Sequence, residues 1–284
     1  MSNSNNPLQG YLRNPKLYII VPSGGKFSNL ETISGISGEI PIYPLTSMDE
    51  TMLRNPDALL NGESMANVIK SCTGLTNAHE LTSNDVDVIL LAIRFATYGD
   101  ELELTLTCPA CSATVETTIS IEPILETVTP LEDHYDVTLD NGLICDLKPY
   151  TFKDSQKAAL AAFRETTELN NLINSESDEL ARLATFNKSF VAMAELNIEI
   201  LSNAITKVTI PQDNGEPVEV TEHEYIAEWV RGISKTHADV IIDKLNEINE
   251  LGIDRDVDIT CTECGHGFKT RVEFNPSNFF DFAS

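Results

Sequence analysis

Two short segments, Cys108-Pro109-Ala110-Cys111 and Cys261-Thr262-Glu263-Cys264, decide the fold of this chain. In each, the first cysteine follows a strand in which apolar and polar residues alternate, and a second alternating strand begins soon after the second cysteine. Such a turn is a zinc knuckle, and two facing knuckles complete a tetrahedral four-thiolate site. The sequence therefore predicts one structural Zn²⁺ ion. The predicted ligands are Cys108, Cys111, Cys261 and Cys264.

The main alternative for these cysteines is redox chemistry. A thioredoxin-like Cys-x-x-Cys lies at a helix N-terminus, where the helix dipole lowers the thiol pKa. Both pairs here lie between predicted strands, which disfavours that interpretation. A catalytic zinc needs an open coordination position, and four thiolates leave none. His266 is a further candidate ligand that we interpret as a surface residue, and Cys72 and Cys145 are interpreted as small buried hydrophobes.

The chain between the two cysteine pairs predicts an inserted helical block. The alternating pattern of 101–121 forms the first hairpin, and Asp140-Asn141-Gly142 is typical of the turn of a second one. Helical periodicity then covers 154–169 and 178–205, followed by a hairpin at 208–220 and two further helices. The expected fold class is α+β, with β-hairpins that carry two zinc knuckles paired with each other and a helical block inserted between them.

These patterns predict five parts of the chain. Because the knuckles are about 150 residues apart, the metal would tie the second β-element back to the first across the helical block. The expected parts are a flexible N-terminal arm (1–15), an α+β domain with the first knuckle (16–151), a helical subdomain (152–252), the returning second knuckle hairpin (253–274) and an aromatic tail (275–284).

Local signals position several further elements. Residues 16–21 are typical of a strand, and 33–45 of a short hairpin around Gly38. Thr82 or Ser83 is expected to cap an apolar helix that ends near Thr97. Thr221 with Glu224 predicts a capping box in front of a later helix.

The charge of the chain restricts its partners. With 44 acidic and 19 basic side chains, the formal net charge is −25. Such a chain should repel nucleic acid and anionic membrane surfaces, so a basic protein surface is a better candidate partner. The alternative is that the charge serves solubility alone. No secretory signal and no membrane span are visible in the sequence. We therefore expect a reducing compartment, in which thiols stay free or bind metal.

No motif in the sequence supports catalysis. Ser23-Gly24-Gly25-Lys26 resembles part of a phosphate loop, but the upstream glycine is absent and Phe27 stands where the Ser/Thr should be. His223-Glu224 lacks the second histidine of a metalloprotease helix, and Gly35-Ile36-Ser37-Gly38 is one residue short of a nucleophile elbow. The sequence therefore predicts a protein that is not an enzyme.

Several segments of the N-terminal half together point to a known family. They are Val21-Pro22-Ser23-Gly24-Gly25-Lys26-Phe27, Ser37-Gly38-Glu39-Ile40, Thr46-Ser47-Met48-Asp49-Glu50, Val68-Ile69-Lys70-Ser71-Cys72, Ala96-Thr97-Tyr98-Gly99 and Cys108-Pro109-Ala110-Cys111. In these segments the chain resembles the T-even-type phage baseplate proteins. The resemblance covers about residues 15–125, and the second cysteine pair is consistent with it. The helical block matches less specifically.

The resemblance implies a structural component of the baseplate of a contractile-tailed phage, at the hub and within a symmetric assembly. It implies a virion protein that is assembled in the host cytoplasm and binds other baseplate, hub or tape-measure proteins. A chaperone of hub assembly that leaves before the virion is complete is the alternative that the resemblance leaves open. A Cys-x-x-Cys redox protein is the alternative from a different class.

Overall fold

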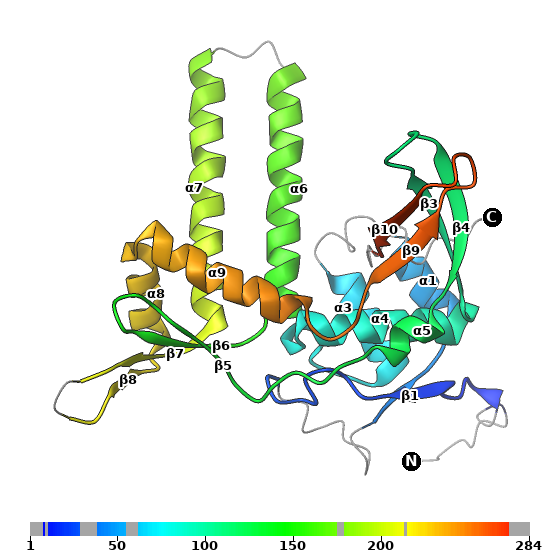
Figure 1. The fold of residues 1–284 in the computed structure, drawn as a ribbon, viewed down its shortest axis with the longest axis horizontal. Helices are drawn as coiled ribbons and strands as arrows, with labels where there is room; N and C mark the ends of the chain where they lie inside the picture. Colours follow the sequence, from blue (N-terminus) through cyan, green and yellow to red (C-terminus); the bar gives the residue numbers. More distant parts are fainter. Residues whose placement is uncertain are drawn as a thin grey trace, which may run out of the picture.

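The chain folds into two halves with separate hydrophobic cores, and a pair of long helices projects from the region between them (Figure 1). The computed structural model describes residue 8 and residues 11–28, 39–54, 62–174, 179–212 and 215–272, with side chains described outside 168–186. The predicted aromatic tail and residues 1–7, 9 and 10 of the predicted arm lie outside this part of the chain.

The first half contains short helices and two-stranded sheets. Strand β1 pairs antiparallel with β2, and β3 pairs antiparallel with β4. Residues 33–38 of the predicted hairpin at 33–45 lie outside the described residues, and its described strand pairs with β1. The elements of this half are β1 (Leu17–Ile19), β2 (Ile40–Ile42), α1 (Ser47–Leu53), α3 (Glu63–Thr73), η3 (Ala78–Glu80), α4 (Ser83–Tyr98), β3 (Glu101–Thr107), β4 (Thr114–Ser120) and α5 (Glu122–Glu126).

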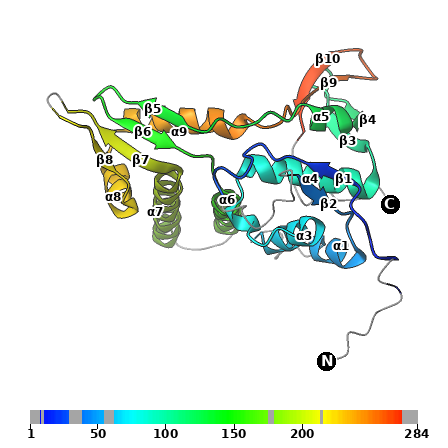
Figure 2. The same cartoon turned by 90° about the horizontal axis from the view of Figure 1, so that it is seen from below.

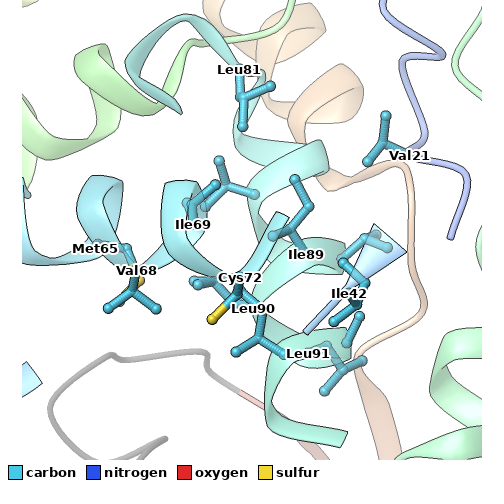
Figure 3. Close-up of a cluster of buried hydrophobic side chains, with 14 of the residues drawn as sticks. Val21, Ile42, Met65, Val68, Ile69, Cys72, Leu81, Ile89, Leu90 and Leu91 are labelled. Carbon is cyan, nitrogen blue, oxygen red and sulfur yellow. The ribbon is translucent and has the colours of Figure 1, made fainter. Parts of the chain in front are cut away.

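Helix α4 is the centre of the first core. Its N-cap is Thr82, as predicted, whose hydroxyl accepts a hydrogen bond from the backbone N–H of Asp85. Figure 3 shows Ile89, Leu90 and Leu91 of this helix packed among side chains from α3 and β2. A helix buried on nearly all sides forms a rigid base for the hairpins that follow it.

The second half is built on a four-stranded antiparallel sheet with the order β5-β6-β7-β8. Its central pair joins β6 to β7, so the sheet combines strands from both sides of the domain boundary that the sequence predicts near residue 152. The elements from β5 onward are β5 (Tyr135–Thr138), β6 (Ile144–Leu147), α6 (Phe152–Asn174), α7 (Glu179–Ala204), β7 (Ile205–Ile210), β8 (Val218–Val220), α8 (His223–Gly232), α9 (Lys235–Glu250), β9 (Asp256–Thr260) and β10 (Gly267–Arg271).

The second core lies between this sheet and the helices beside it. Leu201 and Ala204 of α7 pack with Ile226 of α8 and with Ile241 and Leu245 of α9. The turn between β5 and β6 contains Gly142 at φ +84, which agrees with the predicted hairpin turn. The sheet, α8, α9 and the end of α7 thus form one packed unit.

Helices α6 and α7 form an antiparallel pair that stands out from both halves (Figure 1), and Figure 2 shows the two nearly end-on, side by side. The predicted helices at 154–169 and 178–205 are confirmed. The capping box predicted for α8 is wrong: its N-cap is Glu222, and no side chain of the box caps the helix. The side chain of Glu222 instead accepts a hydrogen bond from the backbone N–H of Thr221.

Candidate metal centre

The first cysteine pair lies in the turn between β3 and β4. The backbone N–H of Cys108 donates to the carbonyl of Ala113 at 2.9 Å, and the N–H of Ser112 donates back to the carbonyl of Cys108 at 2.9 Å. Ser112 has φ 59, a left-handed conformation that is uncommon outside glycine. This turn closes the hairpin and places both cysteines at its tip.

The second pair repeats this backbone geometry between β9 and β10. The N–H of Cys261 donates to the carbonyl of His266, and the N–H of Gly265 donates to the carbonyl of Cys261, both at 2.9 Å. Gly265 has φ +73, as expected from its position in the turn. Gly267 has no positive φ and begins strand β10. The two turns therefore have the same backbone conformation, with Ser112 and Gly265 in equivalent positions.

The two turns face each other and bring the four predicted ligands together. The Sγ atoms of all four cysteines lie within 4.8 Å of one another. The Sγ of Cys108 lies 3.8 Å from that of Cys264, and the Sγ of Cys111 lies 3.8 Å from that of Cys261. A regular tetrahedron of sulfurs around zinc, with Zn–S of roughly 2.3 Å, has edges of roughly 3.8 Å. The donor set and its spacing fit a tetrahedral metal ion.

The packing around these cysteines is sparse. Cys108 and Cys261 are buried, at 0 and 1% exposed, in a small cluster with Val115 and Ile259. Hairpins β3-β4 and β9-β10 form separate sheets, and no strand of one is hydrogen-bonded to a strand of the other. An isolated two-stranded hairpin is marginally stable at best in water. The small cluster and the four sulfurs therefore carry most of the contact between the hairpin tips.

The thiols have distinct electrostatic environments. Hydrogen bonds from the backbone N–H groups of Cys111 and Ala110 lower the pKa of the Cys108 thiol to about 6. The N–H of Ala113 lowers the pKa of Cys111, but the neighbouring thiols, that of Cys264 first, raise it more, and the result is a pKa of about 12. Thiols this close oppose one another's ionisation unless a cation lies among them.

The remaining cysteines and His266 are accounted for separately. Cys72 and Cys145 are buried in the first and second cores, and burial raises the pKa of each thiol to about 11. This agrees with their interpretation as buried hydrophobes. The ring of His266 stacks on Phe268, with centroids 6.4 Å apart, and lies outside the group of four cysteines.

Side chains that the sequence analysis missed attach the second hairpin at its base. Arg255 pairs with Asp87 of α4, and Arg271 pairs with Glu250 at 2.7 Å. The N–H of Val272 donates to the carbonyl of Arg255 at 2.9 Å. The signal for such a pair in the sequence was the charge of Asp87 within the apolar stretch Val86–Leu91.

The fold and site define an α+β protein whose two distant hairpins meet at a four-cysteine cluster. A family model described as T4 bacteriophage base plate protein matches residues 16–281. The chain therefore belongs to this family, and its location is the tail baseplate of the phage virion. Baseplate membership gives it a structural role.

Two further comparisons found no match. No curated protein and no solved structure matches the chain. Within the described ranges, no helix is both long enough and apolar enough to cross a membrane.

Proposed function

We propose that this chain is a structural subunit of the hub region of the baseplate, and that a Zn²⁺ ion bound by its four clustered cysteines staples its fold. The observation that carries the zinc proposal is the pair of 3.8 Å distances between sulfurs of opposite knuckles. These distances match the edges of a zinc–thiolate tetrahedron. They are too long for a disulfide, whose sulfurs lie about 2.05 Å apart.

When bound, zinc would supply a crosslink between two thiolates of each hairpin, without an open position for chemistry. The residues of the chain prepare this crosslink. Their turns fix the cysteine positions before metal arrives, and the N–H groups of Ala110 and Cys111 point at the Cys108 sulfur. The role is structural, because each half already has its own core and the metal adds only the link between the hairpin tips.

The zinc proposal is tested by metal content, measured by mass spectrometry on untagged protein. We expect one zinc per chain in the wild type and none in Cys108→Ser/Cys261→Ser. The matched control is Cys72→Ala/Cys145→Ala, which removes two cysteines outside the cluster and should keep the metal. Metal-free wild-type protein whose four thiols titrate freely or oxidise in pairs would overturn the proposal and favour the redox alternative.

The proposed partners are other proteins of the baseplate hub, the tape-measure protein among them, arranged around the symmetry axis of the tail. Family membership supports partners in the baseplate, and the position at the hub is our proposal. Crosslinking of purified tails followed by mass spectrometry tests it. Crosslinks to hub or tape-measure proteins are expected, and crosslinks only to peripheral baseplate proteins would contradict the hub position. Absence of the chain from mature tails would favour the assembly-chaperone alternative.

A further inference from the structure

Although the chain is strongly acidic, basic side chains gather along one side of α6. A cavity of about 580 Å³ lies between the loop at 25–28, η3 and the start of α6. Among the described residues its lining includes Lys26, Lys148, Lys153 and His79, with Glu80 as the one acidic side chain. Side chains with a basic or titratable nitrogen from four different segments thus line one hollow.

This cavity continues into a groove along the projecting helices. A hollow of about 290 Å³ shares His79 and Lys153 with it and extends to Lys157 and Leu160. A third hollow, of about 390 Å³, shares Lys157 and Leu160 and lies between α6 and α7. We call the three together the α6 groove. From Lys153 to Leu160 it follows α6 for about 10 Å, at 1.5 Å per residue.

Two lysines of the α6 groove have no acidic partner among the residues that the structure describes. Lys26 pairs with Asp133, and Lys157 pairs with Glu199. Across the described residues, Lys148 and Lys153 form no ion pair. Lys153 lies in the first turn of α6, and Lys148 lies four residues before that helix begins. A groove with uncompensated positive charge on a chain of net charge −25 favours an anionic ligand by charge complementarity.

The far end of the α6 groove has an apolar strip with polar and charged side chains around it. The strip consists of Leu160 and Ala161 of α6 and Ala192, Met193 and Leu196 of α7, and the same hollow is also lined by Lys157, Arg164, Glu165, Ser189 and Glu199. Small and flexible apolar side chains form an adaptable surface for a partner's apolar residues. A ligand that fills the whole groove therefore needs carboxylates at one end and apolar groups at the other.

We infer that the α6 groove binds an acidic, partly apolar peptide segment of a neighbouring protein. Its carboxylates pair with Lys148 and Lys153, and its apolar side chains pack between α6 and α7. That the ligand is a protein segment rests on the proposed baseplate role, whereas the charge and shape of the groove do not depend on it. This adds an acidic partner to the basic partner that the net charge favours.

A free phosphate fits the α6 groove less well. The cavity at its start is far larger than one phosphate and has the size of sites for larger ligands. The loop that resembles a phosphate loop is also committed elsewhere: the N–H and the hydroxyl of Ser23 donate to the carboxylate of Asp85, at 2.8 and 2.6 Å. This loop contributes the side chain of Lys26 but not the backbone cradle that binds phosphate in P-loops.

The test is fluorescence anisotropy of a short labelled peptide of glutamate and leucine, titrated with full-length protein. We expect binding by the wild type and a loss of about tenfold or more in affinity for Lys148→Glu/Lys153→Glu. The control, Lys235→Glu/Lys244→Glu, makes the same charge change on α9, where neither lysine lines the groove. It should bind like the wild type. Thermal unfolding of both variants checks that they are folded.

Three results would overturn the inference. They are no binding of the acidic peptide by the wild type, an equal loss in the α9 control, and displacement of the peptide by inorganic phosphate at equimolar concentration. Self-association that Lys148→Glu/Lys153→Glu abolishes in sedimentation would support it and identify a second copy as the source of the segment. Zinc content measured on the same samples separates this test from the metal proposal, because neither lysine contacts the cysteines.

Discussion

The guanidinium of Arg255 pairs with the carboxylate of Asp87, although the two residues are 168 positions apart in the chain. Asp87 lies on α4, the central helix of the first core, and Arg255 directly precedes β9. This pair holds the base of the second hairpin against the first half, while the cysteines join the two hairpin tips. The hairpin is thus attached at both ends by residues that are distant in sequence.

Replacing Arg255 with alanine should destabilise the protein by about 2 kcal/mol at neutral pH, because Asp87 then lacks its cation in a mostly buried position. Urea unfolding measures this. The matched variant is Arg271→Ala, whose ion pair with Glu250 is exposed and should contribute less than about 1 kcal/mol. Equal losses of unfolding free energy in the two variants would show that the Arg255–Asp87 pair contributes no more than an exposed pair.

The stability of the wild type relative to Asp87→Asn should depend on pH. Burial raises the pKa of Asp87 from 3.8 to about 6, with Arg255 opposing the shift. Between pH 3.8 and about 6, Asp87 is mostly ionised in the unfolded chain but still mostly protonated in the folded protein. The contribution of Asp87 to stability is therefore complete below about pH 4 and lost as pH rises through 6.

The expected change between the two proteins across this window is up to about 3 kcal/mol, measured by urea unfolding from pH 4 to 7. Taking the difference between them cancels the protonation of the thiols, which both share. A difference that stays constant with pH, or moves in the opposite direction, would refute a raised pKa for Asp87.

Chelation of the metal should loosen the hairpins and leave the rest of the fold intact. We expect a fall in the melting temperature on the order of 10 °C and faster amide hydrogen exchange in β3-β4 and β9-β10. The sheet β5–β8 should keep its protection, because its core contains none of the four cysteines. Exchange that rises equally in all strands would mean that the metal supports the whole fold.

The contribution of the left-handed backbone at Gly265 to stability can be tested by substitution with alanine. At Gly265, φ is +73 and an added Cβ would meet nothing within 4 Å, so Gly265→Ala changes backbone strain alone. We expect a loss of about 1 kcal/mol. Gly267 has equal space but no positive φ, so Gly267→Ala should be nearly neutral. In the first knuckle, Ser112→Gly should stabilise slightly, because it relieves the same strain. Thermal unfolding of the three variants measures these effects.

The sequence by itself determined the local elements and the type of the candidate site. Alternation with period two indicated both strands of the β3-β4 hairpin, and Thr82 marked the start of α4. The two Cys-x-x-Cys pairs identified the cysteines that the fold brings together. These signals succeed because side-chain direction, capping and ligand spacing depend on residues a few positions apart.

Only the tertiary structure decided how distant segments meet. The pairing of β6 with β7, the contact of Arg255 with Asp87 and the gathering of Lys26, Lys148 and Lys153 in one groove have no local signature. Each joins segments separated by long stretches of chain. Such contacts form where packing of the two cores brings the segments together, and that packing is a property of the whole chain rather than of any short stretch.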